Sequence, residues 1–362
     1  MSFRGIVERV LASADVRLDG DRPWDVRVHD PRFFRSAVLR GTLGVGESYV
    51  DGWWDCDALD ELVARVGRSS ADDLLPDWGD AALRLSSRLV NLQSTLRASQ
   101  VAERHYDLGN AFFREMLGPT MTYSCGYWAE AETLEQAQAA KMDLICRKLG
   151  LQEGDRILDI GCGWGSLLRH AAERYGCEGL GISVSAPQIA WAREHSAGLP
   201  LRFETLDYRS PDLKGPFHHI VSVGMFEHVG RKNHRVFLAR ARALLAEGGL
   251  LLLHTIGNDH AASDPWLHRY IFPNGELPST RQLARALQGL FVLEDWHNFR
   301  LDYWRTIRVW AERFRSPDPR FTRLWRFYLL SMAGTFKAGG RNQLWQLVLS
   351  PHGVADGYRS PR

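Results

Sequence analysis

Apolar and polar positions alternate in regular blocks between residues 133 and 254, and these blocks predict helices and strands in turn. Strands that alternate with helices over short loops predict a parallel, doubly wound α/β sheet. The predicted strands end at Asp159 or cover 178–183, 201–206, 219–223 and 250–253. The predicted helices cover 133–149, 164–175, 185–198 and 234–246.

Capping signals support two of these helices. Thr133 with Gln136 predicts a capping box at the start of the first, and Gly150 stands where that helix should stop. The pair Ser185 and Gln188 has the same spacing, with Gly198 as the expected stop of its helix.

The chain before this region predicts a smaller N-terminal α+β domain over residues 1–75. Residues 26–28 alternate like a short strand, and Phe33, Phe34, Val38 and Leu39 fit one face of a helix. Glycines and aromatics crowd residues 41–56, which we interpret as packing or interaction surface. Residues 76–104, with an amphipathic stretch over 81–98, are predicted to link this domain to a catalytic domain over 105–362.

A glycine-rich turn follows the first strand of the predicted sheet. Asp159 ends the strand, and Gly161, Gly163 and Gly165 lead into the next helix. Glycines are needed where a backbone approaches a ligand closely, and a helix N-terminus offers free N–H groups to that ligand. The G-x-G-x-G spacing weakens a dinucleotide-binding interpretation, and the missing Lys-Ser/Thr excludes a P-loop.

Polar residues stand at, or just after, the carboxyl ends of the predicted strands. In a doubly wound sheet, ligands bind outside these ends. Five residues scattered along the sequence should therefore meet at one rim. They are Asp159, Ser183, Asp207, Glu227 and His254.

Composition limits the class of protein. The 362 residues are 45% hydrophobic and carry a net charge of +2. No apolar run approaches the roughly 20 residues of a membrane span, and no secretory signal is evident. The five cysteines lack a C-x-x-C spacing, which favours a reducing cytoplasm and argues against a zinc site or a disulfide framework. We therefore expect no metal.

Positive charge is concentrated near the end of the chain. Residues 300–362 hold 12 Lys/Arg and 4 Asp/Glu, interleaved with aromatics. Such a segment could bind anionic lipid or nucleic acid, or it could be a solvated helix face whose Arg stems cover apolar surface.

The motifs, taken in order, resemble those of the cyclopropane-fatty-acyl-phospholipid synthases, which are class I methyltransferases with a Rossmann-like fold. The resemblance covers nearly the whole chain. It is carried by HYDLGN, PTMTYSCGYW, LDIGCGWG, GISVSAPQ, LDYR, VGMFEHVG, LLHTIG, RYIFPNGELPS and EDWHNFRLDYWRTIRVWAERF.

The resemblance implies transfer of a methylene from S-adenosylmethionine to the cis double bond of an unsaturated phospholipid acyl chain. In the family, the alkene attacks the sulfonium methyl, and a bound bicarbonate removes a proton from the resulting cation. By motif, the bicarbonate would be held by Cys125, Glu227, His254, the backbone at Ile256, and Tyr303. The S-adenosylmethionine would be held by Tyr123, Ser124, Asp159, Gly161, Gly163, Ser183, Gln188, Leu206, Asp207 and Tyr208.

One residue of this set raises a physical difficulty. Glu227 beside a bound anion would place two negative groups together, so Glu227 should be protonated or paired to a charged His254. A plain hydrogen-bonded pair of strand-end residues is the structural alternative.

Partners and alternatives follow from the same resemblance. We expect a homodimer that is cytoplasmic and peripherally associated with the inner face of the membrane, where its phospholipid substrate lies. A related lipid methyltransferase that leaves a methyl or methylene branch remains open, as does a methyltransferase for a small molecule. Nucleic-acid binding through the Arg-rich segment leaves the rim residues unexplained, so no nucleic-acid partner is expected.

Overall fold

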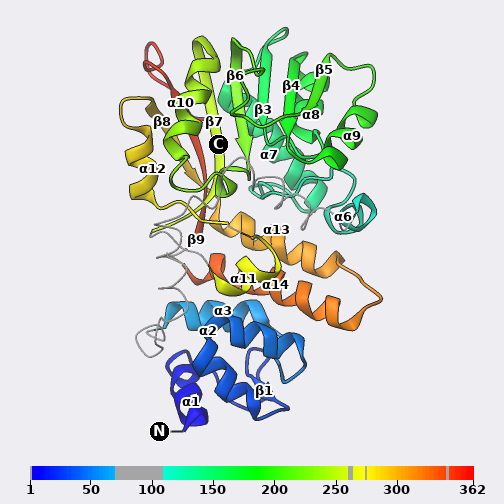
Figure 1. Cartoon of the computed structure of the whole chain (residues 1–362), viewed down its shortest axis with the longest axis vertical. Helices are drawn as coiled ribbons and strands as arrows, with labels where there is room; N and C mark the ends of the chain where they lie inside the picture. Colours follow the sequence, from blue (N-terminus) through cyan, green and yellow to red (C-terminus); the bar gives the residue numbers. More distant parts are fainter. Residues whose placement is uncertain (1, 70–108, 260–263, 274, 340–341) are drawn as a thin grey trace. The chain divides into compact units, whose positions relative to one another are not determined.

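The computed structural model describes residues 2–69, 109–259, 264–273, 275–339 and 342–362, and its contacts divide the chain into two compact units (Figure 1). The first unit comprises Met1–Asn91, Ala262–Gly275 and Tyr303–Asn342. The second comprises Leu92–Ala261, Glu276–Asp302 and Gln343–Arg362. The predicted linker over 76–104, its amphipathic stretch and most of the HYDLGN motif lie outside the described residues.

The second unit is built on a seven-stranded sheet in the order β5-β4-β3-β6-β7-β9-β8. Adjacent strands from β5 to β7 run parallel, whereas β8 and β9 pair antiparallel. The prediction of a doubly wound, mostly parallel sheet is confirmed. The strands are β3 (Arg156–Ile160), β4 (Glu178–Ser183), β5 (Leu201–Thr205), β6 (Phe217–Val223), β7 (Leu245–Asn258), β8 (Val292–Asn298) and β9 (Asn342–Ser350).

Helices cover both faces of this sheet, because alternate strand residues belong to two different cores. Leu158 and Leu251 pack with α10 and α12, whereas Ile157 and Leu252 pack with α7, α8 and α9. The helices of this unit are α6 (Asn110–Leu117), α7 (Leu134–Leu149), α8 (Ser166–Tyr175), α9 (Ala186–His195), the short η2 (Phe226–His228), α10 (His234–Leu244), α12 (Thr280–Leu287) and the start of α13 (Arg300–Arg313).

Helix α7 forms as its capping signals predict. The Thr133 hydroxyl accepts from the backbone of Gln136, whose side chain accepts in return from the Thr133 N–H. Gly150 ends the helix in the left-handed conformation. Because both ends are specified locally, the face that α7 turns toward the sheet is specified too.

Two sequence expectations for this unit are wrong in detail. Strand β7 continues to Asn258, so His254 lies inside the strand rather than at its end. The ladder to β6 ends at Val223 and His254, and beyond it Asn258 forms a bridge to Ser279. Helix α9 ends at His195, and Ser185 does not cap it through its side chain.

The first unit is mainly helical. Its elements are α1 (Phe3–Ser13), β1 (Arg27–Val28), α2 (Arg32–Val50), β2 (Trp54–Asp55), α3 (Leu59–Arg68), α11 (Pro265–Tyr270), most of α13, and α14 (Pro319–Ala338). No helix among the described residues has both the length and the apolarity needed to cross a bilayer.

The glycine- and aromatic-rich segment of the first unit packs against its own helices. A Cβ at Gly46 would lie 2.3 Å from Trp266, so only glycine allows this approach. Tyr49 and Trp54 are buried, and the ring of Phe327 contacts both. Segment 41–56 therefore serves packing. The predicted apolar face of the preceding residues is only partly buried, because Leu39 of α2 is 58% exposed.

Arginines and one lysine of the Arg-rich segment form ion pairs with acidic residues inside the first unit. Arg323 lies 2.8 Å from Asp55, and Lys337 lies 2.7 Å from Glu61. Arg320 pairs with an aspartate at the end of α2 in the same way. Such pairs are partly exposed and individually weak, but they balance part of the positive charge that the sequence concentrates here.

Candidate active site

The glycine turn connects β3 to α8 through three residues with positive φ. Gly161, Gly163 and Gly165 have φ of 88°, 54° and 78°. A Cβ at Gly161 would lie 2.6 Å from the Met225 side chain. At Gly163, by contrast, a Cβ would meet nothing within 4 Å. Gly163 therefore presents bare backbone to an open space.

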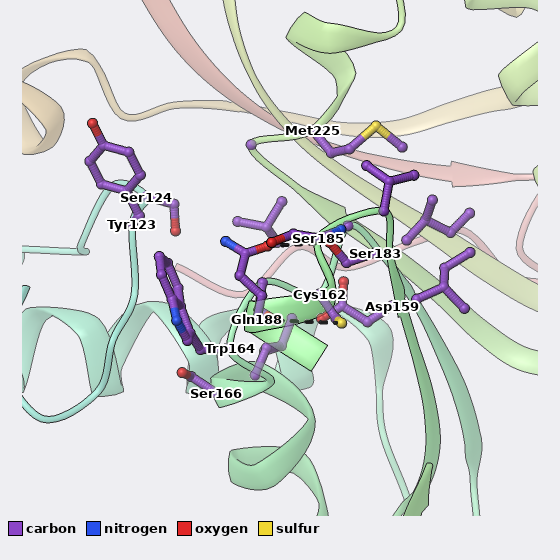
Figure 2. A pocket seen from close by; sticks show the side chains of 18 of the residues that line it. Tyr123, Ser124, Asp159, Cys162, Trp164, Ser166, Ser183, Ser185, Gln188 and Met225 are labelled. Atoms are coloured by element: carbon purple, nitrogen blue, oxygen red, sulfur yellow. Dashed lines mark hydrogen bonds between the residues drawn. The ribbon is translucent and has the colours of Figure 1, made fainter. Parts of the chain in front are cut away.

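That space is a pocket at the carboxyl ends of β3 and β4 (Figure 2). All ten residues that the family resemblance assigns to the cofactor line it. They are Tyr123, Ser124, Asp159, Gly161, Gly163, Ser183, Gln188, Leu206, Asp207 and Tyr208. Residues from widely separated motifs thus line one cavity, as expected if ligands bind at the carboxyl ends of the strands.

Asp159 is the buried carboxyl group of this pocket. Its side chain is 2% exposed, and Oδ1 has no hydrogen-bond partner among the described residues. Burial raises the pKa of Asp159 to about 7, and the charge of Lys141 opposes that rise. A cationic ligand group in the pocket would supply a partner for this carboxylate.

Two further pairs shape the pocket walls. The Ser183 hydroxyl donates to Gln188 Oε1 over 3.2 Å, which explains why Gln188 does not take part in a capping box. The Asp207 carboxylate accepts from the side chain of Arg209 over 2.7 Å. Burial alone would raise the pKa of Asp207, but hydrogen bonds from Arg209 lower it overall, so the group stays charged.

A second group of predicted residues borders the pocket without lining it. Cys125 follows Ser124, a pocket residue. Glu227 precedes His228, another pocket residue, and His254 pairs in the sheet with Val223, which also lines the cavity. Cys125 and Glu227 therefore stand next to pocket residues in the chain, and His254 stands next to one across the sheet.

Glu227 is buried and makes one strong contact. Its Oε1 accepts from the backbone N–H of Ile256 over 2.6 Å, whereas Oε2 has no hydrogen-bond partner among the described residues. Burial raises the pKa of Glu227 to about 7, against the lowering effect of the Ile256 hydrogen bond. Near neutral pH a large share of Glu227 is therefore protonated, and the Ile256 N–H faces this carboxyl group.

His254 lies on the α7 face of β7 and is neutral. Burial, and then the positive charges of Lys141 and Lys148, keep its pKa well below the ordinary value. Of the two states expected for this pair, these pKa shifts favour a protonated Glu227 over a charged His254. Gln346 Nε2 lies 3.2 Å from His254 Nδ1, and because an amide NH₂ can only donate, the ring proton belongs on Nε2.

Cys125 is fully buried, and its thiol donates to a backbone carbonyl. The acceptor is Gly126 O, 3.0 Å away. Phe299 O lies 4.0 Å from the same sulfur. The thiol thus acts as a small polar donor in an enclosed position.

Tyr303 belongs to the first unit, where its ring packs against Trp310 and Phe336. Its predicted role at the anion therefore remains a prediction.

Sequence reasoning missed two polar residues of helix α7. Lys141 lines the pocket, and Gln138 is fully buried beside it. A signal was present: both occupy core positions of an otherwise apolar helix face that includes Leu134 and Ile145. Polar side chains at such positions require buried partners, and that requirement points to a site.

The comparisons with known proteins agree with this geometry. Residues 93–347 match the family described as mycolic acid cyclopropane synthetase. The chain is 46% identical to the cyclopropane-fatty-acyl-phospholipid synthase of Escherichia coli, over 99% of this chain and 95% of that protein. A probable fatty acid methyltransferase of Pseudomonas putida is 37% identical over 70% of this chain and 69% of its own length.

A solved structure supports the fold. The crystal structure of mycolic acid cyclopropane synthase CmaA1 complexed with SAH and CTAB has a TM-score of 0.64 and 29% sequence identity. The match covers 70% of this chain and 98% of that one. The predicted class I methyltransferase fold is confirmed.

The open space at Gly163 yields the first prediction. In Gly163→Val, the side chain would enter the pocket, so we expect binding of S-adenosylmethionine in calorimetry to be abolished. Gly198→Val is the matched control, because Gly198 also has positive φ with no atom within 4 Å of a Cβ. Both should lose roughly 1–2 kcal/mol of stability from left-handed strain. Equal affinity in a folded Gly163→Val protein would refute this site.

The buried Glu227 yields a pH prediction. Between about pH 4.5 and 7, the folded protein holds a proton on Glu227 that the unfolded chain has lost, so the group lowers the free energy of unfolding as pH rises. Glu227→Gln does not titrate, so its stability should fall less steeply in this window. Above it, the variant should be more stable than wild type by on the order of 1–3 kcal/mol.

Urea denaturation across this pH range measures the effect. Glu130→Gln, at an exposed position, controls for the substitution itself and should parallel wild type. A Glu227→Gln profile that also parallels wild type would show that Glu227 is charged in the folded protein.

Proposed function

This chain belongs to the mycolic acid cyclopropane synthetase family, and on that premise we propose that the pocket and the Cys125, Glu227 and His254 group together form a cyclopropane on a lipid. The protein is an S-adenosylmethionine-dependent methyltransferase that acts on the cis double bond of unsaturated phospholipid acyl chains. The observation that carries this function is the near-full-length similarity to the Escherichia coli enzyme.

The residues of the pocket fit the cofactor. Bare backbone at Gly163 leaves room for a ligand, and the unpartnered Oδ1 of Asp159 suits an ammonium group. Ser183 and Gln188 supply hydroxyl and amide groups for the ribose hydroxyls, in place of the acidic residue that many nucleotide sites use at this strand end. We therefore assign cofactor binding to the ten predicted residues, all of which are among those that line the pocket.

The cofactor, when bound, supplies an electrophilic methyl group on a sulfonium. An alkene is a weak nucleophile that no base can activate by deprotonation, so the protein must align it and exclude water. Positive charge that develops on the acyl chain can be stabilised by aromatic faces. Such faces lie beside His254: the Phe299 ring is 6.0 Å from it, and Tyr127 is 5.5 Å from Phe299.

Closing the ring requires a base. The methyl carbon forms two new carbon–carbon bonds and must lose one proton. Glu227 is less well placed, since its Oε1 already accepts from the Ile256 N–H and a large share of the group is protonated near neutral pH. We assign the role to a bound bicarbonate, which takes the proton and leaves as carbonic acid.

The described groups suit an anion better than the sequence suggested. A protonated Glu227 can donate from Oε2, and the neutral His254 can donate from Nε2. The Cys125 thiol donates to Gly126 O in this structure and would become a third donor by turning its S–H to the anion. These donors can hold an anion. Because a protonated Glu227 carries no negative charge, the repulsion expected between Glu227 and the anion is absent. Tyr303 is the fourth proposed donor.

The product provides the test of the function. With a trideuterated methyl group on the cofactor, the enzyme should add a ring carbon that keeps two deuterons, since one is lost to the base. Mass spectrometry and proton NMR of the lipid distinguish this from a methyl branch that keeps all three deuterons, and from an exocyclic methylene. A branched product would place the protein with the fatty acid methyltransferases, one of which is 37% identical.

The base provides a separate prediction. Turnover on unsaturated phospholipid vesicles should fall in bicarbonate-depleted buffer and recover on addition, because occupancy follows mass action. Cys125→Ser should lose less activity than Glu227→Leu, since a hydroxyl still donates to the anion whereas leucine offers no donor. If bicarbonate has no effect and Cys125→Ser is the inactive variant, the thiol itself is the catalytic group.

We further propose that the protein attaches peripherally to the cytoplasmic face of the membrane as a homodimer. The substrate chain lies in a bilayer, which requires reversible docking. The ion pairs of Arg320 and Arg323 inside the first unit reduce the charge available for lipid. Flotation with anionic vesicles at rising salt tests how far docking is electrostatic, and light scattering tests the dimer.

A further inference from the structure

Lys141 is a buried cation at the junction of the two subsites. It lies in α7, is 2% exposed and lines the cofactor pocket. Its Nζ donates to Ser124 Oγ over 2.9 Å. Ser124 itself stands between Tyr123, which lines the pocket, and Cys125, which is proposed to hold the anion. A single side chain thus contacts the segment that joins both subsites.

Gln138 completes this attachment one helical turn earlier. Its Nε2 donates to the backbone carbonyl of Ser124 over 2.8 Å and lies 3.4 Å from that of Thr122. Residues three apart on a helix share a face. Gln138 therefore anchors the backbone of segment 122–125, and Lys141 anchors the side chain of Ser124 in the same segment. Gln138 shows that a neutral side chain is enough to hold this segment by hydrogen bonds. The positive charge of Lys141 therefore needs a further explanation.

The charge of Lys141 acts on groups from three elements and one loop. It interacts with Asp159 of β3 and with Cys125 of the loop, and it lowers the pKa of His254 of β7 and of His170 of α8. Burial lowers the pKa of Lys141 to about 8, and the charges of Cys125 and Asp159 oppose this. No ion-pair partner within 4.0 Å of its Nζ is found among the described residues, so its charge is only partly balanced.

The other buried lysine of α7 provides a contrast. Lys148 lies two turns later, does not line the pocket, and pairs with Asp295 over 3.0 Å. Arg362 also contacts Asp295, 2.8 Å away. Burial lowers the pKa of Lys148 to about 8 as well. The two lysines are therefore alike in burial and helix face, and differ in whether a carboxylate balances them.

We propose that Lys141 is a positioning residue that fixes segment 122–125 between the two subsites and whose positive charge draws the anionic base to the site beside Cys125 and His254. This inference rests on the proposed bicarbonate base. It explains why a cation is buried next to a pocket for a cationic cofactor: the charge serves the anion. It also explains how a site with a neutral His254 can retain an anion.

The experiment measures bicarbonate binding without turnover. The rise in melting temperature that bicarbonate produces, relative to chloride at equal ionic strength, reports binding to the folded protein. We expect Lys141→Met, which keeps the volume and removes the charge, to weaken the apparent bicarbonate affinity at least about tenfold. Lys148→Met should change it by no more than about twofold, since Asp295 balances that charge in wild type.

The pH dependence separates charge from structure. In wild type, bicarbonate affinity should fall as pH rises through about 8, because the Lys141 ammonium loses its proton. Lys141→Met should lack this decline, whereas Lys141→Arg should keep binding at high pH. Glu227 titrates in all three proteins. The pKa of Asp159 rises further without the charge of Lys141, so Lys141→Arg, which keeps that charge, is the comparison that isolates the lysine. If Lys141→Met fails to fold, the comparison of wild type with Lys141→Arg across this pH range still tests the role of the Lys141 charge.

The outcomes are distinguishable. If wild type shows neither binding nor activation by bicarbonate, the proposed base is wrong. If wild type binds bicarbonate and Lys141→Met binds it equally well, the role of Lys141 is refuted. Equal losses in Lys141→Met and Lys148→Met would also refute it, because the effect would then be one of overall charge. Cofactor affinity in calorimetry should change less than bicarbonate affinity in Lys141→Met, and the reverse order would assign the charge to the cofactor.

Discussion

Polar groups buried on the α7 face of the sheet are the constraint on which the site depends. Lys141 comes from α7, Asp159 from β3, His254 from β7 and Gln346 from β9, and all four are nearly inaccessible to water. An unpaired polar group in such an environment is costly, so each needs its neighbours in place. The rotation of α7 about its axis must therefore be correct. The capping box and Gly150 specify where the helix begins and ends, and its buried apolar positions, such as Leu134 and Ile145, specify the face that it turns inward.

This constraint links the two halves of the site. Segment 122–125 and the β6–η2 connection line the pocket and lead directly to Cys125 and Glu227, and His254 of β7 pairs with the pocket residue Val223. A change that moves one subsite must therefore move the other. Such sharing suits a reaction in which methyl transfer and proton removal occur at the same carbon, because the base must stand close to the methyl group that is being transferred.

Much of this arrangement could be predicted from the sequence. Strand-end residues such as Asp159 and Ser183 follow from hydrophobic periodicity and the rule for parallel sheets, since both depend on local pattern. The position of His254 inside β7 could not, because the strand is prolonged by pairing with its neighbours. Gln188 was assigned to a helix cap on spacing alone, whereas its contact with Ser183 depends on how α9 docks. Lys141 was missed because a polar residue at a core position of a helix shows that buried partners are needed but does not show which ones.

The organisation of the first unit shows the same limit. Residues 262–275 and 303–342 were predicted to belong with the catalytic domain, but their contacts group them with the N-terminal helices. Their ring contacts and ion pairs join residues more than 200 positions apart in sequence, such as Tyr49 and Phe327. Sequence composition shows that such aromatics and charges exist, and tertiary packing decides with which partners they meet.

We therefore predict that the cofactor pocket and the anion site lie side by side, formed by residues that are neighbours in the chain or across the sheet. A crystal structure of the protein with S-adenosylhomocysteine and bicarbonate tests it directly. We predict the nucleoside between Gly163 and the Ser183–Gln188 pair, and a planar anion within hydrogen-bond distance of Cys125 and His254. A cofactor bound elsewhere, or an anion found only at the protein surface while the cofactor occupies the pocket, would contradict the account.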